Sequence, residues 1–174
     1  ALMLASMKGH EATVRALVAF GADVGQVNSY GGTALMFASG NGHEATVRAL
    51  VDLGADVNRE HSIGGKTGYT ALMSASLNGH EATVRALVER GANVGHVDSD
   101  GYTALMYASE KGHEATVRAL GKLGANGNAV EMGVALILAS REGHTETARA
   151  LLDLGANPEA SISDFDFRAG GMLK

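Results

Sequence analysis

The second quarter of the chain carries two successive helical patterns of hydrophobic and polar positions. Thr33 precedes a largely apolar run over residues 34–39, and Gly42 follows it. Threonine is a favourable N-cap and glycine a favourable helix terminator, so this stretch predicts a short first helix. Apolar residues then recur at helical spacing between 44 and 53. The pattern predicts a second helix, ended by a left-handed residue at Gly54.

The same pattern returns along the chain with nearly the same letters. GHEATVRALV occupies 9–18, 42–51 and 79–88, and GHEATVRALG occupies 112–121. Gly-His pairs begin at 9, 42, 79, 112 and 143, which gives spacings of 33, 37, 33 and 31 residues. A period near 33 is typical of one supersecondary unit per repeat. The sequence therefore predicts a stack of helix pairs.

Composition narrows the class of protein. The 174 residues are 45% hydrophobic, which argues against disorder, and they include no cysteine, so neither disulfides nor thiolate metal sites are expected. The net charge of −5 argues against a phosphate-binding nucleic-acid protein, and no apolar run is long enough to cross a bilayer. An intracellular, reducing compartment, either cytoplasm or organelle interior, is the expected location.

The repeated letters resemble the ankyrin repeat. The resemblance is carried by TALM at 33–36, GH at 42–43 and LGADVN at 53–58, and by GYTALM at 101–106 with GH at 112–113. It implies a mainly α fold, an ankyrin-repeat solenoid of stacked antiparallel helix pairs joined by hairpin-like finger loops. Alanine replaces the motif's proline, and methionine replaces its first histidine. The threonine–histidine hydrogen bond of the family is therefore expected to be absent, with methionine packing in its place.

The resemblance divides the chain into one array, residues 1–165, with units at about 1–27, 28–64, 65–97, 98–128 and 129–165. Residues 166–174 are expected to begin a possible sixth unit or to form an irregular tail. The first unit lacks its finger, and its outer face carries apolar side chains instead of polar ones. We therefore expect the array to continue beyond both ends.

The resemblance also implies which positions face the concave groove between fingers and first helices. Five of the eight aromatic residues fall on such positions. Exposed tyrosines with polar neighbours are typical of interface anchors, although rings that only cover finger backbone would give the same pattern. We predict that the anchors Tyr69, Tyr102 and Tyr107 lie on the surface, so that their loss barely disturbs folding. The predicted partner-binding residues are Tyr30, Phe37, Lys66, Tyr69, Asp100, Tyr102, Tyr107 and Lys111.

Other repeated side chains favour structural roles. Four arginines follow a glutamate by four residues, as in solvated ion pairs on an exposed helix. Histidines one unit apart are too distant to share a metal ion, and His61 and His96 are expected to be exposed on fingers. No catalytic triad or zinc-protease motif occurs, and the P-loop-like letters at 63–68 lack the first glycine. No catalytic residue, metal site or cofactor is predicted.

Two links break the period. Residues 59–64 lengthen one finger by four residues, which favours a tolerated surface loop over an extra contact. The link at 124–128 is two residues short, and Gly121 replaces a valine. With a helical glycine behind it and no threonine cap, the fifth unit is expected to open more readily than its neighbours, so amides of 135–153 should exchange faster than those of 71–89.

The sequence therefore favours a non-enzymatic module that binds another protein through its groove and fingers. The alternative is a structural subunit of a larger assembly, held through its ends and outer helices. Partner identity and oligomeric state do not follow from the letters.

Overall fold

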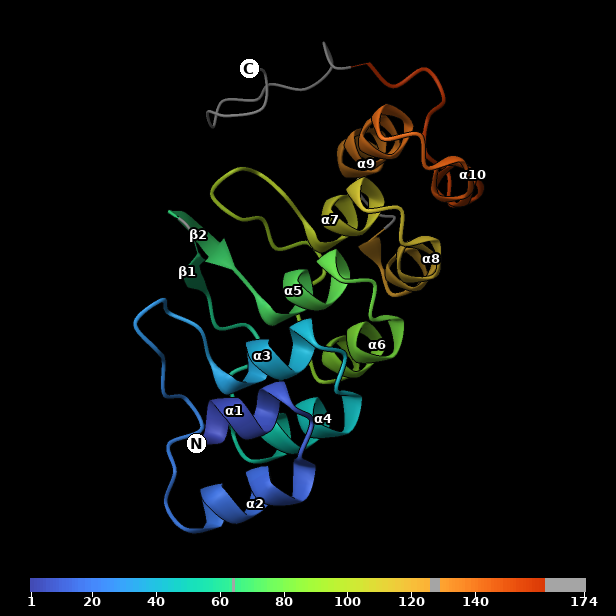
Figure 1. The fold of residues 1–174 in the computed structure, drawn as a ribbon. Helices are drawn as coiled ribbons and strands as arrows, with labels where there is room; N and C mark the ends of the chain where they lie inside the picture. The colour runs from blue at the N-terminus through green and yellow to red at the C-terminus, as the bar shows by residue number, and fades with distance from the viewer. Residues whose placement is uncertain (64, 126–128, 162–174) are drawn as a thin grey trace.

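The protein is a curved stack of helix pairs, seen here in a computed structural model that describes residues 1–63, 65–125 and 129–161. First helices form one column, second helices form another, and the fingers project from the edge beside the first column (Figure 1). The first helices are α1 (Leu2–Met7), α3 (Ala34–Gly40), α5 (Ala71–Leu77), α7 (Ala104–Glu110) and α9 (Ala129–Arg141). The second helices are α2 (Glu11–Ala19), α4 (Glu44–Asp52), α6 (Glu81–Glu89), α8 (Glu114–Lys122) and α10 (Thr145–Asp153).

Local sequence sets the helix boundaries as predicted. Thr33, Thr70 and Thr103 cap the first helices of their units, each accepting a hydrogen bond from the amide of the methionine three residues on. Those methionines are buried, in agreement with their predicted packing role. Gly42 and Gly54 have φ of 74° and 96°, the left-handed values expected where the helices end.

Histidine rings join each unit to the one before it. The Nε2 atoms of His43, His80, His113 and His144 lie 3.0 Å from backbone carbonyl oxygens of the preceding unit. Because a carbonyl only accepts, each ring donates from Nε2. Each ring also covers the Gly of the preceding Gly-His pair so closely that a Cβ there would come within 2.6 Å of a ring atom. The repeated Gly-His pair is therefore an interface between units.

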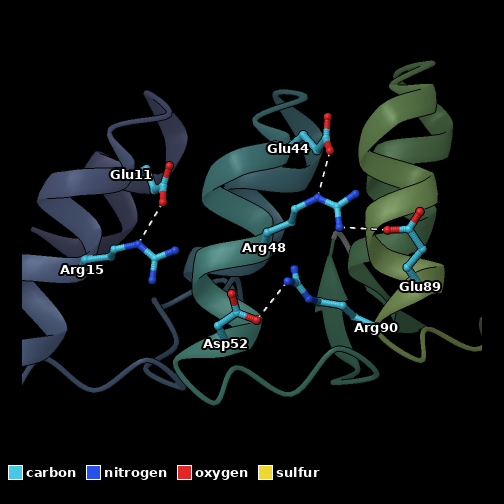
Figure 2. A network of polar contacts seen from close by, with 7 residues as sticks. All are labelled: Glu11, Arg15, Glu44, Arg48, Asp52, Glu89 and Arg90. Carbon is cyan, nitrogen blue, oxygen red and sulfur yellow. Dashed lines mark hydrogen bonds and ion pairs between the residues drawn. The ribbon is translucent and has the colours of Figure 1, made fainter.

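The four predicted glutamate–arginine pairs are present on the second helices, with nitrogen–oxygen distances of 2.8–2.9 Å. Arg48 also reaches Glu89 of the next unit at 2.8 Å, and Arg90 reaches back to Asp52 at 3.0 Å (Figure 2). On the outer face, charged side chains thus form ion pairs both within a second helix and between the second helices of neighbouring units.

We predict that Lys122→Glu adds one more such pair. Residue 122 has the same register to Arg85 that Glu89 has to Arg48, but it carries the wrong charge. The substitution should raise the free energy of unfolding by about 0.2–1 kcal/mol, as is usual for exposed pairs. Chemical denaturation checks the gain. A matching gain in Lys122→Met would contradict the pairing, since methionine only removes the repulsion.

The four-residue insertion is not a simple surface loop. It forms strand β1 (His61–Ile63), which pairs antiparallel with β2 (Lys66–Tyr69) in a hairpin. Ser99 donates its amide hydrogen to Thr67 O at 2.9 Å, so the hairpin also bonds to the next finger. The expectation of a tolerated loop without contacts is therefore wrong. An extended finger here gains backbone partners that local sequence reasoning cannot see.

The fifth unit departs from the predicted pattern. Its first helix, α9, begins at Ala129, so Val134, which takes the place of the capping threonine of the other units, lies inside a 13-residue helix. The space over Gly121 is filled by Leu154 of the fifth unit, whose Cδ1 would lie 2.5 Å from a Cβ there. The missing side chain at Gly121 therefore makes room for Leu154 and is not only a loss of packing. Part of the short link, residues 126–128, and the predicted tail at 166–174 lie outside the described residues. Faster exchange in this unit stays a prediction.

The candidate groove and its tyrosine cluster

The candidate site lies where the fingers meet the first helices. The finger turns of the second and fourth units are each built on a side chain that accepts two backbone hydrogen bonds. Asn28 Oδ1 accepts from the amides of Tyr30 and Gly32 at 3.0 and 2.9 Å. Asp98 Oδ1 accepts from those of Asp100 and Tyr102, both at 2.9 Å. The two turns thus present equivalent positions along the groove.

Tyr69, Tyr102 and Tyr107 are not exposed. They form a buried cluster in which only 8%, 5% and 7% of each residue remains exposed. The Tyr107 ring centroid lies 5.6 Å from that of Tyr69 and 5.0 Å from that of Tyr102. The prediction that these three are exposed is therefore wrong, and because they are buried we now expect their loss to destabilise the fold. The finger residues Tyr69 and Tyr102 instead pack against Tyr107 of α7, which the letter pattern alone does not reveal.

The Asp98 carboxylate hydrogen-bonds to the tyrosine cluster. Its Oδ2 accepts a hydrogen bond of 2.5 Å from the Tyr107 hydroxyl, while its Oδ1 fixes the turn that carries Tyr102. Burial, and then the bond to this carboxylate, raise the pKa of Tyr107 above its ordinary range. Burial also raises the pKa of Tyr69 and of Tyr102 to about 12. The hydroxyls thus remain protonated hydrogen-bond donors at neutral pH.

A second buried contact joins the fourth and fifth units. Thr103 donates from its hydroxyl to Glu131 Oε1 at 2.6 Å, and both residues are buried. Desolvation raises the pKa of Glu131. The extension of α9 by its early start brings this carboxyl to the cap of α7. The letters around Glu131 give only a weak signal for this contact, because the contact depends on the early start of α9.

His61 is buried too, with 7% of the residue exposed, against the expectation of a free finger histidine. Its ring centroid lies 6.1 Å from that of Tyr69, and neither ring nitrogen has a hydrogen-bond partner among the described residues. Burial, and then the charge of Arg59, lower its pKa from 6.5 to about 4. His96 is half-buried and donates to Gly68 O at 2.9 Å. The inserted hairpin therefore covers one side of the tyrosine cluster.

The lowered pKa of His61 predicts a pH-dependent stability. Between about pH 6.5 and about pH 4 the unfolded chain binds a proton at His61 that the folded chain does not, so stability falls as the pH falls. The free energy of unfolding, relative to that of His61→Phe, should drop by about 1–3 kcal/mol across this window. Denaturant titrations at several pH values measure the difference. Parallel curves for both proteins would contradict it.

The remaining predicted residues are at the surface or beyond what is described. Tyr30 is 79% exposed, Phe37 is half-buried and Lys111 is exposed. Asp100 is partly exposed on the finger turn. Lys66 lies in β2, and its side chain is outside the described part of the structure.

Tyr30 and Phe37 border a pocket of about 340 Å³ on the groove. The pocket is mostly apolar, with a few amide and hydroxyl groups at its edge, as is usual for binding pockets. The sequence does not predict this pocket, because the pocket arises from missing side chains in one unit. Its lining residues are Asn28, Tyr30, Gly32, Met36, Phe37, Gly40, Asn41 and Ser74.

The described residues include neither a metal-binding group of side chains nor a membrane-spanning helix. Within 1–63, 65–125 and 129–161, no group of three His, Asp or Glu side chains is placed to hold a metal ion. Across the same ranges, no helix combines the length and the hydropathy needed to span a membrane.

Comparison with known families gives a match over most of the chain. Residues 1–61, 59–131 and 95–162 each match the profile of the family described as "Ankyrin repeats (3 copies)". No curated protein is significantly similar to the chain in sequence.

Proposed function

The chain belongs to the ankyrin-repeat family, and on that premise we propose that it is a non-enzymatic module whose concave groove and finger loops bind another protein. Ankyrin repeats are in general protein–protein interaction modules. The observation that carries the proposal is an apolar groove pocket beside a largely exposed tyrosine, Tyr30. Large exposed aromatics next to a pocket are typical of interface anchors.

The proposed contact surface runs along the fingers. Tyr30 and Phe37 provide its apolar part, and Lys66, Asp100 and Lys111 provide charged positions farther along the array. The buried cluster of Tyr69, Tyr102 and Tyr107 packs under this surface. A packed cluster limits the motion of the fingers before binding, and this lowers the entropic cost of ordering them when the partner binds. The absence of cysteine is consistent with an intracellular partner.

Affinity capture from the source cells, followed by mass spectrometry and a binding titration with the captured partner, tests the proposal. Tyr30→Ala should weaken binding roughly thirtyfold, the effect of losing a central anchor of about 2 kcal/mol. Because the ring is exposed, the midpoint of thermal unfolding should stay within a few degrees.

Arg85→Ala is the matched control. Arg85 lies on α6, where its nitrogens pair with Glu81 at the outer face. This variant should bind the partner as the wild type does. If Arg85→Ala loses the partner and Tyr30→Ala keeps it, the outer helices are the contact and the structural-subunit alternative takes the place of the groove proposal.

A further inference from the structure

The groove pocket coincides with a position where the array elsewhere places a tyrosine. Gly32 follows the finger glycine of its unit, as Tyr69 and Tyr102 do in theirs. Those two rings are buried, whereas the second unit has no side chain at this position. The pocket in the second unit therefore lies where a ring is missing.

The walls of the pocket match the surroundings of Tyr69. The Tyr69 hydroxyl lies near Ser74 of its own unit, and its ring packs against Tyr107 of the next unit. Phe37 and Ser74 hold the corresponding positions around Gly32, and both line the pocket. A ring bound there would lie between Phe37 and Ser74 as Tyr69 lies between Ser74 and Tyr107.

A second missing side chain enlarges the space. Gly40 takes the position that Leu77 and Glu110 hold in the next two units, and it also lines the pocket. The volume of about 340 Å³ is within the range of small-molecule pockets and leaves room for one aromatic side chain.

Polar groups at the pocket edge distinguish a phenol from a plain phenyl ring. In the fourth unit the carboxylate of Asp98 receives the hydroxyl of Tyr107. In the second unit the pair is Asn28 and Phe37, and the Asn28 amide nitrogen donates to no residue among those described. Asn28, Asn41 and Ser74 line the pocket, so amide and hydroxyl groups lie at its edge for an oxygen on a bound ring.

We propose that this pocket binds an aromatic side chain of the partner protein, with a tyrosine hydroxyl favoured over an unsubstituted ring. The inference rests on the proposed groove function and adds the chemical class of the residue recognised there. The occupant replaces the tyrosine that the chain itself supplies in its third and fourth units.

Titration of the full chain with p-cresol, the side-chain analogue of tyrosine, tests the inference by amide chemical shifts. We expect saturable shifts at Gly32, Phe37, Gly40 and Ser74 with a dissociation constant on the order of 1 mM, appropriate to a small fragment. Toluene should bind at least threefold more weakly. Shifts that are spread over the surface or do not saturate would overturn the inference.

Gly32→Tyr supplies the missing ring and should reduce p-cresol affinity at least tenfold. Gly32 does not have a positive φ, and the closest side-chain atoms to a Cβ there are 3.3 Å away on Phe37, so the backbone accepts a side chain if that ring shifts slightly. Gly95→Tyr, with no atom closer than 3.8 Å to its Cβ, is the matched control and should bind p-cresol as the wild type does. If Gly32→Tyr fails to fold, Gly40→Leu blocks the same pocket. Undiminished binding in the folded blocking variant would overturn the inference.

The two proposals fail separately. If p-cresol does not occupy the pocket but Tyr30→Ala still loses the captured partner, the aromatic inference is wrong and the groove proposal stands. If p-cresol saturates the pocket but only Arg85→Ala loses the partner, the pocket exists and the groove is not the protein contact.

Discussion

Gly79→Ala is expected to lower the free energy of unfolding by about 3–5 kcal/mol, of which the left-handed backbone explains about 1–2 kcal/mol. Gly79 has a φ of 73°, and a Cβ there would lie 2.5 Å from Nδ1 of His113. The ring cannot withdraw without losing the 3.0 Å bond that it donates to Leu77 O. Both the strain and the lost bond lie at the interface between the third and fourth units.

Gly91→Ala in the same unit separates these causes. Gly91 has a φ of 90° with no atom within 4 Å of the added Cβ, so only the backbone penalty of about 1–2 kcal/mol should remain. In a His113→Ala background, Gly79→Ala should cost no more than Gly91→Ala, because the ring is gone. Chemical denaturation of the wild type, Gly79→Ala, Gly91→Ala, His113→Ala and the Gly79→Ala/His113→Ala double variant measures the coupling. Equal costs for Gly79→Ala with and without His113 would contradict a ring contact between units.

Asp98→Ala is expected to cost about 3–4 kcal/mol, since it removes the acceptor of two backbone amides and of the Tyr107 hydroxyl in a buried site. Asp98→Asn should cost about 1 kcal/mol or less, because a side-chain amide keeps the Oδ1 contacts. The chain provides the precedent, as Asn28 makes the same two bonds in the second unit.

The pairing of Asp98 with Tyr107 should appear in a double-mutant cycle. Tyr107→Phe should cost about 1.5–3 kcal/mol in the wild type, where it leaves a buried carboxylate oxygen without its donor. In the Asp98→Asn background the cost should be smaller, because Asn with Phe is the combination already present at Asn28 and Phe37. Thermal or chemical unfolding checks this. Equal costs in both backgrounds would show that the hydroxyl bond does not stabilise the cluster.

The sequence predicted the features that depend on residues close together along the chain. Thr33 caps a helix and Gly42 ends one because both effects depend on neighbouring backbone, and the Glu44–Arg48 pair depends on a spacing of four residues. Repetition then extended each local prediction to the other units. The ankyrin fold followed from the order of these features.

Features that depend on contacts between units were missed. Tyr69 was expected to be exposed because its finger position alone suggests a free surface, yet its ring reaches Tyr107 of the next unit. Gly121 was read as a loss because Leu154, which fills its space, lies in the following unit. The pocket depends on absent side chains at Gly32 and Gly40, which become informative only when the positions of Tyr69 and Leu77 are known.

In the proposed complex the groove and fingers, and not the outer helices, contact the partner. Hydrogen–deuterium exchange of the full chain, alone and bound to the captured protein, tests this arrangement most directly. We expect added protection at the finger amides of Tyr30, Gly32 and Asp100 and in the half-buried C-terminal ends of α3 and α5. Protection confined to α4, α6 and α8, with unchanged fingers, would contradict it.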